Sequence, residues 1–110
     1  MAGKFELKQS DSGKFHFNLK AGNGQVILSS ETYESRAAAE NGIASVAKNA
    51  ADDALYDRKT STNGKAFFTF TATNGQIIGT SEMYESEAAR DNGIESVKTN
   101  APGAAIAETA

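Results

Sequence analysis

The sequence predicts an α+β fold in which two copies of a β-β-β-α unit, related by pseudo-twofold symmetry, share one mostly antiparallel sheet of six or more strands with both helices on one face. Three observations support this prediction. The segment NGIASVAKNA at 41–50 returns as NGIESVKTNA at 92–101. Within each copy the hydrophobic period changes once, from two residues to about 3.6. Almost no linker separates the copies.

The duplication covers nearly the whole chain. About half of the positions in residues 5–50 are identical to the positions 51 residues later, in residues 56–101. Such agreement over two segments of ~50 residues indicates an internal repeat. The matches include Gly13-Lys14 with Gly64-Lys65, Phe17 with Phe68, Asn23-Gly24-Gln25 with Asn74-Gly75-Gln76, and Tyr33-Glu34-Ser35 with Tyr84-Glu85-Ser86.

Each copy begins with three predicted strands. Residues 14–20, KFHFNLK, alternate apolar and polar side chains, which is typical of a half-buried strand. A shorter strand at 5–8 precedes them and a returning strand at 25–29 follows. In the second copy the corresponding strands are predicted at about 55–59, 65–71 and 76–80.

Asn-Gly pairs join the second and third predicted strands of each copy, at Asn23-Gly24 and Asn74-Gly75. They predict type I′ turns, in which both central residues take positive φ. Although Gly22-Asn23-Gly24 superficially resembles a phosphate-binding loop, it joins two strands and lacks the downstream Gly-Lys-Ser/Thr. We therefore assign these residues a structural role.

A helix follows in each copy. Ser35 and Ser86 stand at the positions of N-caps, ahead of Ala-rich stretches. Gly42 and Gly93 lie inside the predicted helices, where a glycine costs about 1 kcal/mol relative to alanine. We interpret both glycines as points of close packing. The second helix ends at Pro102.

The size of one copy predicts that both belong to a single domain. About fifty residues bury too little apolar surface to offset their ordering entropy of roughly 1–2 kcal/mol per residue. We therefore predict one domain over 1–110, built from repeats at about 5–50 and 56–101 with a short tail at 102–110. Residues 1–51 alone should not form a stable monomer. The whole chain is expected to be a monomer or a strand-swapped homodimer.

Composition excludes several classes of protein. The net charge is −3 and the pI about 5.1, so no basic field attracts nucleic acid or an anionic membrane. The chain has no cysteine, and its single histidine, His16, makes a poor zinc site. No signal peptide or membrane-spanning stretch is visible, which predicts a cytoplasmic protein. We expect no metal, no cofactor and no catalytic residue set.

The repeated pattern NGQ(V/I)I..SE.YES…NGI.SVK.NA resembles the YegP-like family of small bacterial tandem-repeat proteins. The resemblance covers roughly 5–50 and 56–101, and its motif occurs twice in register. It implies two βββα units in one sheet. It also implies that the segment after each helix, 54–59 and 104–108 here, adds a strand to the other unit. The family is uncharacterised, so the resemblance implies no catalytic residues.

The SE.YES segments are the most plausible ligand or partner contacts. Paired carboxylates next to an aromatic ring could exchange protons or bind a cation, although acidic residues before a helix N-terminus also have a structural explanation. Phe67 is a further candidate, because strand alternation places it on the face away from Phe68, near several lysines. The candidate contacts are therefore Glu31, Tyr33, Glu34, Glu82, Tyr84, Glu85 and Phe67.

Three functions remain open from the sequence. The leading hypothesis is a non-enzymatic binding or protein-interaction module that uses the helix-free sheet face or an edge strand. The alternative is a weak nucleic-acid binder that uses the Lys/Phe67 face, a partner that the acidic net charge disfavours. The third is an enzyme or ligand binder that uses the SE.YES segments.

Overall fold

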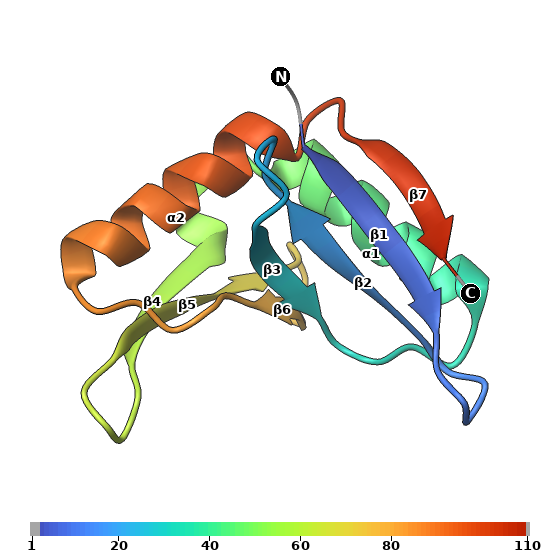
Figure 1. Ribbon diagram of the computed structural model, residues 1–110, viewed down its shortest axis with the longest axis horizontal. Coiled ribbons are helices and arrows are strands. Elements are labelled where there is room, and N and C mark those ends of the chain that lie inside the picture. The colour runs from blue at the N-terminus through green and yellow to red at the C-terminus, as the bar shows by residue number, and fades with distance from the viewer. Residues whose placement is uncertain (1–2, 110) are drawn as a thin grey trace.

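The computed structural model describes residues 3–109, which form a curved seven-stranded sheet with two helices (Figure 1). The predicted fold class is confirmed, and most predicted strands begin or end within one residue of the observed ones. The elements are β1 (Lys4–Gln9), β2 (Phe15–Lys20), β3 (Val26–Ser30), α1 (Arg36–Asn49), a 3-10 helix η1 (Asp53–Leu55), β4 (Tyr56–Thr60), β5 (Ala66–Thr71), β6 (Ile77–Thr80), α2 (Glu87–Asn100) and β7 (Ala105–Thr109).

The strands of both repeats join in one sheet, in the order β4-β5-β6-β3-β2-β1-β7. Strands β1 to β3 and β4 to β6 each form an antiparallel meander. The two meanders meet where β3 pairs with β6 through only two residue pairs, Ser29 with Thr80 and Ser30 with Gly79. The sheet bends at this short junction, as Figure 1 shows.

The strand after each helix pairs with a strand of the repeat that does not contain that helix. β7 follows α2 of the second repeat and pairs in parallel with β1 of the first, from Lys4 opposite Ala105 to Lys8 opposite Thr109. β4 follows α1 and pairs with β5 of the second repeat. The predicted exchange of strands is therefore present within one chain, and the predicted tail at 102–110 contains a strand.

The predicted type I′ turns are wrong. Positive φ is confined to glycines in the part of the chain that the structure describes, so Asn23 and Asn74 do not adopt it. Instead, the amide of Gly24 donates to the carbonyl of Ala21, and Gly24 then takes φ +87°. This is the longer hairpin connection in which a turn is followed by one left-handed residue. Its asparagine accepts a hydrogen bond from the amide of Gln25, 3.0 Å away.

The core lies between the helices and one face of the sheet. Its largest fully buried side chains come from both repeats and include Phe5, Phe17, Phe68 and Phe70. Ser35 and Ser86 cap the helices as predicted, since each hydroxyl accepts a hydrogen bond from the amide three residues later, at 3.1 Å. Among the described residues, no helix is long and apolar enough to cross a membrane.

Candidate functional site

The carboxylates of the SE.YES segments lie exposed at the two corners between sheet and helix. Glu34 forms an ion pair with Lys14 at 2.8 Å, and Glu85 forms the equivalent pair with Lys65. Glu31 is also exposed, and its amide donates to Ile78 across the junction of the repeats. Across residues 3–109, no three acidic or histidine side chains come together in a way that could hold a metal ion.

The two tyrosines of these segments pack under the helices. Tyr33 stacks on Phe17 with the ring centroids 6.2 Å apart. A Cβ atom at Gly42 would lie 2.7 Å from the Tyr33 hydroxyl, and one at Gly93 would lie 2.4 Å from that of Tyr84. Only glycine permits these approaches, which explains the glycine in each helix. Burial raises the pKa of both tyrosines, with a smaller contribution from Glu31 or Glu82, so both hydroxyls stay protonated at neutral pH.

Phe67 is half-buried on the helix-free face, where it stands opposite Lys59. The other lysines of this face surround Glu6 on β1: the ammonium of Lys20 lies 2.9 Å from its carboxylate and that of Lys8 lies 3.6 Å away. The hydrogen bond from Lys20 lowers the pKa of Glu6 below its usual range. Lys4, Lys8 and Lys20 therefore share one acidic partner on their own sheet face, whereas Lys14 pairs with Glu34.

A pocket of about 320 Å³ lies where the two repeats meet. One wall is the face of α1 that carries Ala38, Asn41, Gly42 and Ser45, at the i, i+3, i+4, i+7 spacing of one helical surface. The other wall is the hairpin between β5 and β6, residues 72–78. We call this the junction pocket. Because its walls come from different repeats, one copy of the repeat could not form it.

Four polar side chains line the junction pocket: Tyr33, Asn41, Ser45 and Gln76. Within residues 3–107, none of the four side chains has a hydrogen-bond partner in the protein, and Asn41 and Gln76 are exposed to solvent. The remaining surface is apolar and is supplied mainly by alanines and by Ile77 and Ile78. Ile77 is 42% exposed, which is unusual for a large apolar side chain in this molecule. Unpaired polar groups around a mainly apolar concavity are characteristic of small-molecule sites.

The lining of the junction pocket is retained in both copies of the repeat. Eight of its nine residues are identical at the position 51 residues away, and the ninth, Ile77, corresponds to Val26. Over residues 5–50 and 56–101 as a whole, 24 of 46 positions are identical. The lining is therefore more similar between the copies than the average position. Tyr33 also packs on Phe17, whereas the side chains of Asn41, Ser45 and Gln76 make no hydrogen bond within the described fold.

Of the predicted contact residues, only Tyr33 lines the junction pocket; the carboxylates, Tyr84 and Phe67 do not. Asn41, Ser45 and Gln76 were missed by sequence reasoning. A signal was present in their identity with Asn92, Ser96 and Gln25. It could not be interpreted from sequence alone, because only the structure shows that Asn41, Ser45 and Gln76 line one pocket.

Comparisons with known proteins agree with this architecture. A model of a domain of unknown function, DUF1508, matches the chain twice, at residues 10–57 and 61–108. A UPF0339 protein of Bordetella pertussis is 60% identical over 94% of this chain and 93% of its own length. The UPF0339 protein YegP of Escherichia coli O157:H7 is 53% identical over 91% of each chain.

Two solution structures have the same fold. That of YegP from Escherichia coli, described as a protein of unknown function, superimposes with a TM-score of 0.94 at 48% identity and covers 99% of this chain and 94% of its own. That of a UPF0339 protein from Shewanella oneidensis gives a TM-score of 0.92 at 49% identity, covering 98% and 92%. With both repeats matched and relatives similar over nearly their whole length, the chain belongs to the DUF1508 family and is a homologue of the UPF0339 protein YegP.

Proposed function

We propose that the protein is a non-enzymatic binding module whose ligand site is the junction pocket. The observation that carries the proposal is the set of four unpaired polar side chains, Tyr33, Asn41, Ser45 and Gln76, around an open and mainly apolar concavity. A volume of about 320 Å³ lies at the lower end of the ~300–1,000 Å³ that is usual for small-molecule sites.

The chemistry of the lining supports binding rather than catalysis. Its polar groups are two carboxamides and two hydroxyls, which can donate and accept hydrogen bonds. No histidine, carboxylate or amine belongs to the lining, so none is placed in it to transfer a proton near neutral pH. The hydroxyl of Ser45 also has no base beside it that would make it a nucleophile.

The proposal is tested by titrating ¹⁵N-labelled protein with a library of small fragments and following the backbone amide shifts. We expect binders to perturb residues 38–45 and 72–78 together, because the two segments form opposite walls. Asn41→Ala should weaken such binding, whereas Asn92→Ala, the matched change in the other repeat, should not. Hits that map elsewhere, or equal effects of the two variants, would contradict the assignment of the site.

A variant that fills the pocket gives a second test. Ser45→Leu places a larger apolar side chain at a half-buried position of the lining and keeps a good helix former. We expect binding to disappear while the unfolding midpoint stays close to that of the wild type. Ala44→Leu, at an exposed position of the same helix outside the lining, is the control. Undiminished binding by Ser45→Leu would exclude the junction pocket as the site.

A further inference from the structure

From the lining of the junction pocket, we infer that its ligand is an uncharged, flat ring with a hydrogen-bond donor and acceptor side by side on its edge, the lactam edge of a nucleobase. The inference rests on the proposed function, because it names the chemical class that the same pocket would take. Three properties of the lining support this inference: its lack of charge, its two carboxamides and its size.

The lining carries no charged side chain. A charged ligand would lose hydration on entering the pocket and would meet no opposite charge in return, which is unfavourable. Tyr33 does not supply a negative charge, because burial raises the pKa of its phenol and keeps it protonated. The ligand is therefore uncharged at the part that enters.

Two carboxamides face the pocket from different elements. Asn41 belongs to α1, and Gln76 precedes β6 in the hairpin of the other repeat. A carboxamide offers one acceptor and two donors, and it pairs best with a group that presents a donor and an acceptor together, as asparagine and glutamine do with a base edge. The hydroxyls of Ser45 and Tyr33 add two further groups that can donate or accept.

The shape and size favour a single ring. Apolar surface from Ala38, Ala72, Ile77 and Ile78 can cover the faces of a flat ring and leave its edge to the polar groups. A volume of about 320 Å³ corresponds to roughly ten liquid water molecules at ~30 Å³ each. This fits a pyrimidine or a small bicyclic base, and it is too small for a dinucleotide.

Such a ring could reach the pocket as a free base or as one nucleotide of a single strand. Three probes separate these sources and test the class: uracil and hypoxanthine as free lactams, benzoate as a flat anion, and a single-stranded uridine hexanucleotide. We expect the free lactams to shift the amides of residues 38–45 and 72–78, and benzoate to leave them unchanged. A hexanucleotide that binds more tightly than uracil, with salt-sensitive affinity, would identify the strand as the source.

Variants then test the hydrogen bonds. Asn41→Ala and Gln76→Ala should each weaken lactam binding by about three- to tenfold, the usual effect of losing one hydrogen bond to a neutral group. The matched variants Asn92→Ala and Gln25→Ala should leave the affinity within about twofold. Asn41 and Gln76 are exposed and their side chains have no partner in the described fold, so folding of the variants is not at risk.

The outcomes test the ligand class and the location of the site separately. If benzoate or a purely apolar fragment binds the junction pocket and the lactams do not, the ligand class is wrong and the proposed function stands. If neither the probes nor any fragment perturbs residues 38–45 and 72–78, both are wrong. Lactam binding that is insensitive to Asn41→Ala and Gln76→Ala would overturn the role assigned to the carboxamides.

Discussion

The first strands of the two repeats differ in how many neighbouring strands they have. β1 is the first strand of one repeat and is covered by β7, whereas β4, the first strand of the other repeat, pairs only with β5. On β1, Leu7 is buried opposite Phe17. The equivalent residue on β4 is Arg58, which stands opposite Phe68 and carries a side chain that is 37% exposed.

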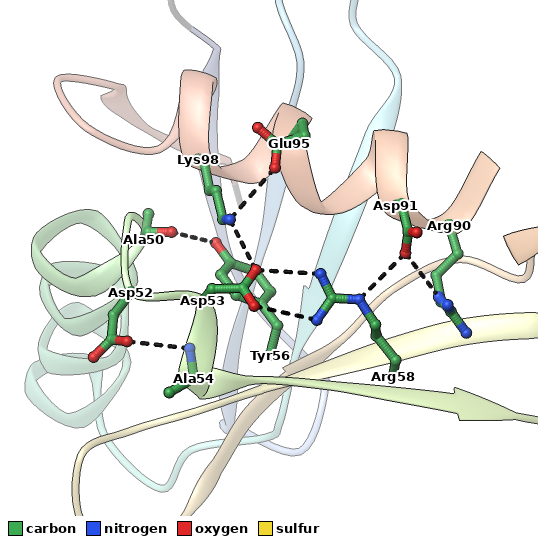
Figure 2. Close-up of polar contacts among 10 residues, drawn as sticks. All are labelled: Ala50, Asp52, Asp53, Ala54, Tyr56, Arg58, Arg90, Asp91, Glu95 and Lys98. Atoms are coloured by element: carbon green, nitrogen blue, oxygen red, sulfur yellow. Dashed lines mark hydrogen bonds and ion pairs between the residues drawn. The ribbon is translucent and has the colours of Figure 1, made fainter. Parts of the chain in front are cut away.

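Arg58 belongs to an ion-pair network that ties the β4 edge to helix α2 (Figure 2). Its guanidinium lies 3.2 Å from Asp53 and 3.3 Å from Asp91 of α2. Lys98 of α2 also reaches Asp53, at 2.9 Å, and its ammonium lies 5.7 Å from the ring centroid of Tyr56. The hydrogen bonds from Arg58 and Lys98 lower the pKa of Asp53 to about 2.

For β1 and β4, side-chain composition follows the number of neighbouring strands. The other edge strand, β7, does not follow this rule, because it exposes Ile106. A strand with neighbours on both sides can carry apolar residues on its inner face. An uncovered edge strand that did so would expose apolar surface and free backbone groups to other chains, and charged residues reduce this hazard.

The first repeat alone should lack a stable monomeric fold. Residues 1–51 would lose β7 from one edge and β6 from the other, and much of the shared core with them. We expect circular dichroism and size-exclusion chromatography to show an unfolded chain or a self-associated one that restores the missing neighbours. A folded monomer of residues 1–51 would show that the strand exchange is dispensable.

Leu7→Ala should destabilise the protein by about 2–5 kcal/mol, the usual cost of truncating a fully buried leucine. The free energy of unfolding from urea denaturation measures it. Lys8→Ala, the next residue on the same strand with its side chain on the other face, is the control and should cost less than about 1 kcal/mol. Similar losses for the two variants would mean that the cover by β7 does not make β1 a core strand.

Tyr56→Phe should cost about 0.5–1.5 kcal/mol at neutral pH, because the hydroxyl of Tyr56 donates to the carbonyl of Ala50 at 2.7 Å. The change installs the residue type that the first repeat has at Phe5, and the ring contacts with Phe68 and Phe70 remain.

The pH dependence provides an independent check on Tyr56. Burial, followed by the charge of Asp53, raises the pKa of Tyr56 in the folded protein above its ordinary value of 10.0. The associated stability is complete below pH 10 and is lost as the pH rises above it. The difference in stability between wild type and Tyr56→Phe should therefore shrink in alkaline solution. A constant difference from pH 8 to pH 11 would contradict the shifted pKa.

Arg58→Leu, which installs the residue of the first repeat, should change the free energy of unfolding by no more than about 1 kcal/mol, because exposed ion pairs contribute little. The main effect of this substitution is expected on the stability at acidic pH. Asp53 has a lowered pKa in the folded protein, so its contribution is present above the ordinary pKa of 3.8 and is lost as the pH falls toward 2.

The acid-induced loss of stability between about pH 4 and pH 2 should therefore be smaller in Arg58→Leu than in the wild type. Lys59→Leu is the control, because Lys59 pairs with Asp57 and is not part of the network around Asp53. An unchanged acid transition in Arg58→Leu would assign the shift of Asp53 to Lys98 alone.

The sequence by itself determined six of the seven strands and both α-helices. Local patterns place the strands and the caps at Ser35 and Ser86, because alternation and capping depend on neighbouring residues only. The duplication predicted the shared sheet. It also predicted close packing at Gly42 and Gly93, since a helical glycine at the same register in both copies requires a steric reason.

The tertiary structure decided the features that depend on contacts between segments distant in the chain. The asparagines of the turns kept ordinary φ because a longer loop closes these hairpins. Strand alternation places Arg58 on the same sheet face as Tyr56, but its ion pair with Asp91 depends on the position of α2. The junction pocket joins Asn41 to Gln76 of the other repeat, which lies 35 positions further along the chain. No local pattern can report such a meeting, because the side chains that line a pocket are brought together by packing and not by sequence spacing.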